Sequence, residues 1–124
     1  MHVIADLQLH SRFARAVSPQ MTIPNIAGWA GRKGIGLVAT GDWMHPMWFR
    51  EIERDLVETW NGLLRLRTKD VGLKSPFFML ATEVSSIYSQ GGKVRRVHTL
   101  IWVPTLESAR KISQAMTKRG CNLM

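Results

Sequence analysis

The chain has 124 residues, of which 45% are apolar and 21% charged, a composition that fits one small globular domain with a buried core. No apolar run approaches the roughly 18–20 residues of a membrane span, and the N-terminus does not resemble a signal peptide. Because the single cysteine, Cys121, cannot form an internal disulfide, we expect a cytoplasmic protein. The formal net charge of +8 favours a phosphate-rich partner such as nucleic acid, and the alternative is a solvated basic surface.

The N-terminal residues 2–10 are predicted to form the first strand. Side chains alternate across a strand, so Asp6, Gln8 and His10 would share one face. The opposite face would carry the apolar residues Ala5, Leu7 and Leu9. A carboxylate, an amide and an imidazole on one face indicate the wall of a polar pocket rather than an ordinary core strand.

The next elements are a helix and a buried strand. Thr22 can cap a helix over residues 23–33, with Pro24 in its first turn, where no amide hydrogen is needed. Gly34 would end this helix. The short apolar run over residues 37–40 is typical of a buried strand.

A loop over residues 41–46 is expected to lead into an amphipathic helix over residues 47–61. Large apolar residues recur there at helical spacing. They are Trp48, Phe49, Ile52, Leu56 and Trp60, of which Trp48 and Trp60 are predicted to lie in the core. Residues 63–75 are basic and poorly patterned, so we expect a loop or a short helix.

Two strands and a last helix complete the prediction. The strands are expected over residues 77–84 and 94–103, with a turn at residues 90–92 between them. Thr105 would open the last helix and Gly120 would stop it. Alternating strands and helices predict an α/β fold with a largely parallel sheet, whose site lies at the carboxyl ends of the strands.

Several polar residues fall at or near these strand ends and form a candidate site. They are Asp6, Gln8, His10, Asp42, His45, Glu83 and His98. Imidazole and carboxylate groups together suit zinc, manganese or iron. The alternatives are that each histidine is an ordinary hydrogen-bonded imidazole, and that Glu83 forms an ion pair with Arg95 or Arg96.

Basic and aromatic residues add candidates for nucleic-acid contact. Lys93, Arg95 and Arg96 alternate imperfectly along the fourth strand, where they could touch phosphate or simply solvate a strand edge. Trp29 and Trp43 could stack on a base, although a structural role is favoured for both. We find no phosphate-binding loop of the Walker type and no nucleophile elbow.

The first strand resembles a known family motif. The segment Asp6-Leu7-Gln8-Leu9-His10-Ser11 is similar to the D-x-H-x-H-S opening of the polymerase and histidinol phosphatase (PHP) superfamily. Further blocks are similar to its endonuclease Q branch, namely Thr40-Gly41-Asp42 with His45-Pro46, Thr82-Glu83-Val84-Ser85, and Gly91 to His98. The similarity runs from about residue 4 to residue 120. It implies a distorted (β/α)7 barrel, of which residues 1–124 would be one partial PHP domain, the N-terminal half.

The resemblance also implies a function. PHP domains bind two or three metal ions and cleave phosphoesters, and the endonuclease Q branch nicks DNA on the 5′ side of deaminated bases (hypoxanthine, xanthine, uracil) or abasic sites. The implied metal ligands are His10, Glu83 and His98, followed by Asp42 and His45, and the ions would be zinc or manganese, with magnesium as a further option. Lys93, Arg95 and Arg96 would hold the backbone of damaged DNA.

Two departures from the family keep other readings open. Gln8 stands where the family has a histidine, which predicts that one ion binds poorly. The later ligands of the family have no counterpart before Met124, so we expect a fragment of a longer chain whose exposed half-barrel self-associates. The alternatives are an inactive copy, a PHP phosphatase acting on a small phosphoester, as histidinol phosphatase does, and a non-catalytic remnant that binds nucleic acid or a partner protein.

Overall fold

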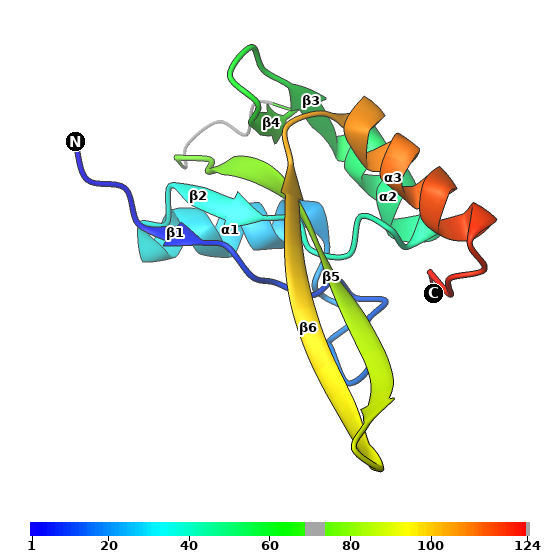
Figure 1. The fold of residues 1–124 in the computed structure, drawn as a ribbon. Coiled ribbons are helices and arrows are strands. Elements are labelled where there is room, and N and C mark those ends of the chain that lie inside the picture. The colour runs from blue at the N-terminus through cyan, green and yellow to red at the C-terminus, as the bar shows by residue number, and fades with distance from the viewer. Residues whose placement is uncertain (69–73, 124) are drawn as a thin grey trace.

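A computed structural model gives the fold of the chain and describes residues 1–68 and 74–123 (Figure 1). Its helices are α1 (Ile23–Lys33), α2 (Pro46–Asp55) and α3 (Leu106–Lys118). Its strands are β1 (Ala5–Asp6), β2 (Leu37–Ala39), β3 (Leu56–Glu58), β4 (Leu64–Leu66), β5 (Phe77–Gln90) and β6 (Lys93–Val103). Within these residues no helix is long and apolar enough to cross a membrane.

The sheet is mixed, which corrects the expectation of a largely parallel sheet. Its strands follow the order β1-β2-β5-β4-β3, and β6 pairs with β5 outside this path. β1, β2 and β5 run parallel, whereas β5–β4, β4–β3 and β5–β6 are antiparallel pairs. Residues 59–63 join β3 to β4 and residues 91–92 join β5 to β6. These connections are too short for the crossover that a parallel pair needs.

Local signals placed α1 and α3 correctly. The side chain of Thr22 accepts a hydrogen bond from the Asn25 amide at the start of α1, and Gly34 ends that helix with a φ of 72°. Thr105 caps α3 in the same way through the Ser108 amide. Both helices begin and end within one or two residues of the predicted positions, because the caps are encoded in a few adjacent residues.

The predicted helix over residues 47–61 is wrong beyond Asp55. Leu56 has extended backbone angles and pairs with Leu66, so residues 56–58 form β3 and residues 64–66 form β4. Leu56 is still fully buried, but Trp60, predicted to lie in the core, is 95% exposed. Pairing between two short apolar segments outweighed the helical spacing there. The remainder of the loop predicted over residues 63–75 includes residues 69–73, which lie outside the described residues.

The core lies between the sheet and the helices α1 and α2. Among its fully buried side chains are Val38 and Phe78 from the sheet and Trp48 and Ile52 from α2. The predicted first strand is shorter than expected: only residues 5–6 pair with β2, and the chain then leaves the sheet.

The β5–β6 hairpin is longer than predicted and extends away from the rest of the molecule (Figure 1). Its strands pair without interruption from Leu80 and Val103 at the base to Gln90 and Lys93 at the tip. Every residue from Ser85 to Thr99 is exposed. The inner end of the hairpin therefore belongs to the body, and its outer part is an arm in solvent.

Candidate functional site

The site begins with a sharp bend after β2. Gly41 and Asp42 both have positive φ values, 64° and 47°. A Cβ atom on Gly41 would lie 2.1 Å from the carbonyl oxygen of Leu9, so only glycine allows the bend to approach the segment that follows β1. Trp48 holds the bend in place, because its indole Nε1 donates to the carbonyl oxygens of Thr40, at 3.1 Å, and Gly41, at 2.9 Å.

This close approach brings Asp42 against the N-terminal segment. One carboxylate oxygen accepts a hydrogen bond of 2.6 Å from the Ser11 amide, and the other lies 3.2 Å from Nδ1 of His10. The second ring nitrogen of His10, Nε2, lies 3.8 Å from Oε2 of Glu83 on β5. His10 therefore stands between two carboxylates, that of Asp42 in the bend after β2 and that of Glu83 on β5.

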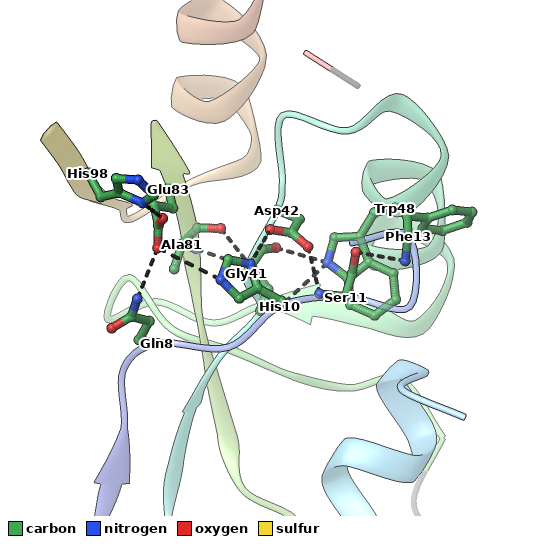
Figure 2. Close-up of polar contacts among 11 residues, drawn as sticks. Gln8, His10, Ser11, Phe13, Gly41, Asp42, Trp48, Ala81, Glu83 and His98 are labelled. Carbon is green, nitrogen blue, oxygen red and sulfur yellow. Dashed lines mark hydrogen bonds and ion pairs between the residues drawn. The ribbon is translucent and has the colours of Figure 1, made fainter. Parts of the chain in front are cut away.

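Glu83 is the centre of the arrangement (Figure 2). Gln8 Nε2 donates to its Oε2 at 2.9 Å, and Nδ1 of His98 on β6 contacts its Oε1. The hydrogen bond with His98 holds the pKa of the Glu83 carboxyl below its ordinary value; desolvation opposes the shift, and the bond from Gln8 and the charges of His98 and His10 support it. Glu83 is therefore a carboxylate over most of the pH range.

We call Gln8, His10, Asp42, Glu83 and His98 the polar network. The register explains its β5–β6 part: Ser85 lies opposite His98, so Glu83 and His98 share one face of the hairpin. The partners of Glu83 are the other members of the network, Gln8, His10 and His98. The alternative that Glu83 forms an ion pair with Arg95 or Arg96 is not found among the contacts of the described residues.

Asp6 and His45 do not join the polar network. Asp6 accepts a hydrogen bond from the Gln8 amide and lines a separate cavity of about 330 Å³ beside α1. His45 starts α2, and its ring stacks on Phe13 with 4.6 Å between ring centroids. It lines a cleft of about 820 Å³ together with Asp42 and Glu83. Its Nδ1 is buried and has no hydrogen-bond partner within the described part of the chain.

The side chains of the polar network contact one another in pairs and do not surround a common position for an ion. In residues 1–68 and 74–123, no group of three or more His, Cys, Asp or Glu side chains is arranged to hold a metal ion. The atoms that would bind a metal are instead engaged with one another, since both oxygens of Glu83 and both ring nitrogens of His10 face network partners.

The three basic candidates lie on two different faces of the arm. Arg96 lies opposite Ile87, which puts it on the face that carries Glu83 and His98. Arg95 lies opposite Tyr88, on the other face, and Lys93 shares that face. Of the tryptophans considered for stacking, Trp43 is buried, whereas Trp29 is 59% exposed and lies beneath the guanidinium of Arg32.

Ser11, Gly41 and Trp48 position the site and were not among the predicted site residues. Ser11 is fully buried and offers its backbone amide, which no side-chain pattern reveals. Trp48 acts through one indole nitrogen on a backbone that precedes it in the sequence. Gly41 was the detectable signal, because a glycine directly after a buried strand and before an aspartate is typical of a sharp turn.

Comparisons with known proteins give three similarities. The chain is 26% identical, over 113 residues, to an uncharacterized protein of Methanocaldococcus jannaschii; the match covers 91% of this chain and 11% of that protein. No family model matches the sequence.

Two solved structures are similar in fold and sequence. The first is the lesion-specific endonuclease Q from Pyrococcus furiosus, with a TM-score of 0.73 and 30% identity, covering 93% of this chain and 25% of that one. The second is endonuclease Q in complex with a 27-mer duplex substrate that has an abasic lesion at the active site. Its TM-score is 0.78 and its identity 32%, covering 98% of this chain and 27% of that one. The chain thus spans about a quarter of these enzymes.

Proposed function

We propose that the chain carries part of the active site of a metal-dependent endonuclease that nicks damaged DNA, as a partial PHP domain. The observation that carries the proposal is the polar network: histidine and carboxylate side chains from four separate segments meet beside β5, in a chain similar over 93–98% of its length to endonuclease Q. The substrate would be duplex DNA with a deaminated base or an abasic site, cut on the 5′ side of the lesion.

The residue types of the network match the donors of a divalent ion, which would have to replace the contacts that these side chains make with one another in this structure. Imidazole nitrogen and carboxylate oxygen are donors that zinc and manganese accept, and magnesium accepts the carboxylates. The holding residues would be His10, Glu83 and His98 with Asp42, and His45 lines the same cleft as Asp42 and Glu83. When bound, such ions lower the pKa of a water molecule and neutralise charge on a phosphate.

The chain's own residues supply position and charge. Ser11 and Trp48 fix the bend, so that the Asp42 carboxylate is held against Nδ1 of His10. The ionised Glu83 carboxylate holds His98 and Gln8 in place. The excess of lysine and arginine, 17 against nine acids, would attract the DNA backbone toward this site.

A nicking assay tests the proposal. The chain is incubated with Mn²⁺ or Zn²⁺ and with end-labelled duplexes that carry one deoxyinosine, one abasic site or no lesion. We expect a single nick on the 5′ side of the lesion, none in the undamaged duplex, and loss of the nick in Glu83→Gln, which keeps the shape of the side chain but removes its charge. Hydrolysis of a small phosphomonoester without nicking would overturn the proposal in favour of a phosphatase.

A second candidate is a non-catalytic DNA-binding domain, and one observation favours it. Gln8 donates a hydrogen bond to the Glu83 oxygen that also faces His10, so the position that holds a histidine in the family motif here blocks a carboxylate oxygen. Lesion-independent binding of the duplexes without any nick, at all metal concentrations tested, would support this candidate.

A further inference from the structure

We propose that the β5–β6 arm is a DNA-binding element in which Arg96 binds a backbone phosphate beside the polar network, whereas Arg95 does not. The inference rests on the proposed function for its partner, DNA, and it goes beyond that function by assigning one face of the arm and one residue on it. The reasons are the charge of the arm, its exposure and its register.

The charge of the arm is of one sign. The sequence has no acid between Glu83 and Glu107, whereas Lys93, Arg95 and Arg96 lie in this interval. Both arginines are exposed, and neither forms an ion pair within the part of the chain that the structure describes. A cationic, solvent-exposed ribbon with no internal counter-ion complements a polyanion, and a two-stranded ribbon has the width that the major groove of DNA admits.

The register then separates the arginines. Along β6, His98 and Arg96 are two residues apart and so project from the same face, with Ser85 and Ile87 as their partners on β5. Two residues of a strand span about 7 Å, which equals an axial rise of about two base pairs of duplex DNA at 3.4 Å per base pair. A strand of DNA whose phosphate lies at the polar network would therefore place a flanking phosphate within reach of the long Arg96 side chain.

Arg95 is a matched control made by the fold itself. It is adjacent in sequence, equally charged and exposed, but it projects from the opposite face together with Lys93 and Tyr88. Replacing either arginine removes one positive charge from the same segment. A difference between the two variants consequently reports the face that meets DNA, and not the net charge.

The experiment measures DNA binding by fluorescence anisotropy for the chain and for Arg96→Gln, Arg95→Gln and Arg96→Lys. The probes are a 27-mer duplex with one abasic site and the same duplex without it. We expect Arg96→Gln to weaken Kd about tenfold and to reduce the slope of log K against log salt by about 1. Arg95→Gln should change Kd less than about twofold, and Arg96→Lys should keep the salt slope, since one cation remains.

Single methylphosphonate substitutions locate the phosphate. Neutralising the phosphate that Arg96 binds should weaken DNA binding by the unchanged chain. It should leave DNA binding by the Arg96→Gln variant unchanged, because that variant already lacks the contact. We expect this phosphate within about two nucleotides of the lesion. An equal loss of DNA affinity in Arg95→Gln and Arg96→Gln, or no loss of affinity in either variant, would overturn the inference. If no lesion is nicked but the two variants still differ, the arm binds DNA as inferred and only the proposed endonuclease function fails.

Discussion

At Gly41 the chain has no room for a side chain. A Cβ atom there would meet the Leu9 carbonyl oxygen at 2.1 Å, and the φ of 64° is itself unfavourable for other residues. We expect Gly41→Ala to lower the free energy of unfolding by at least about 3 kcal/mol, because strain and collision add. Gly34→Ala is the control: its φ is 72°, but nothing lies within 4 Å, so it should cost only about 1–2 kcal/mol. Urea denaturation measures the free energy of unfolding of both variants. An equal loss of stability in the two would contradict the close approach of Gly41 to the Leu9 carbonyl oxygen.

Gln8 is the residue of the polar network that bears most directly on the proposed metal site. Its amide donates to Oε2 of Glu83, so it contributes no nitrogen ligand and occupies an oxygen. We expect Gln8→His to raise the metal bound per chain and to tighten zinc binding by at least about tenfold, since imidazole is the better ligand. Gln8→Ala frees the oxygen without adding a nitrogen. Elemental analysis and a zinc titration compare the three chains, and the same metal content in all of them would show that residue 8 does not face an ion.

Residue types included every member of the polar network among the candidates, but they did not separate these members from Asp6 and His45, which lie outside it. Alternation along a strand predicted one shared face for Asp6, Gln8 and His10; only residues 5–6 pair as a strand, and Gln8 and His10 contact Glu83 and Asp42 from the segment that follows it. Asp6 failed the same rule because its carboxylate turns back to the Gln8 amide. His45 could not be placed from spacing, since the start of α2 at Pro46 and the ring of Phe13 fix its orientation.

At the scale of elements, helix α2 holds the bend on which the site depends. Trp48 is fully buried and donates to two backbone oxygens of the bend. We expect Trp48→Phe to cost about 1–3 kcal/mol, because two buried carbonyl groups lose their donor while a ring remains in the core. Trp60→Phe is the matched control, with its side chain 95% exposed, and should change stability by less than about 0.5 kcal/mol. Thermal and urea unfolding test the pair; a Trp60 effect as large as that of Trp48 would contradict the burial assigned to each.

Helices whose ends are fixed by adjacent residues could be predicted from the sequence, whereas strands that depend on pairing with a distant segment could not. The caps Thr22 and Thr105 fix α1 and α3 locally. β3 exists because Leu56 pairs with Leu66, and β4 in turn pairs with β5. No local sequence pattern predicts either pairing. The arm was underestimated because its outer residues are polar or exposed and gain their strand structure from the cross-strand partner alone.

At the scale of the whole molecule, β1 lies at an edge of the sheet that the described residues form. β1 stands first in the order β1-β2-β5-β4-β3, and the apolar side chains of Val3 and Ile4 next to it are 58% and 64% exposed. An open edge with apolar residues favours pairing with another chain. The charge of +8 opposes such contact through repulsion, more weakly as salt rises.

We therefore expect concentration-dependent self-association that strengthens with salt, measured by sedimentation equilibrium. Ile4→Lys should weaken the association constant by about tenfold or more, because it removes the burial of one isoleucine, worth about 1.5–3 kcal/mol, and adds charge at the edge. Trp60→Lys makes the same kind of change on an exposed apolar residue of the turn between β3 and β4. If Trp60→Lys disrupts the assembly and Ile4→Lys does not, then the β1 edge is not the contact surface. If association weakens as salt rises, charge rather than apolar pairing holds the chains together.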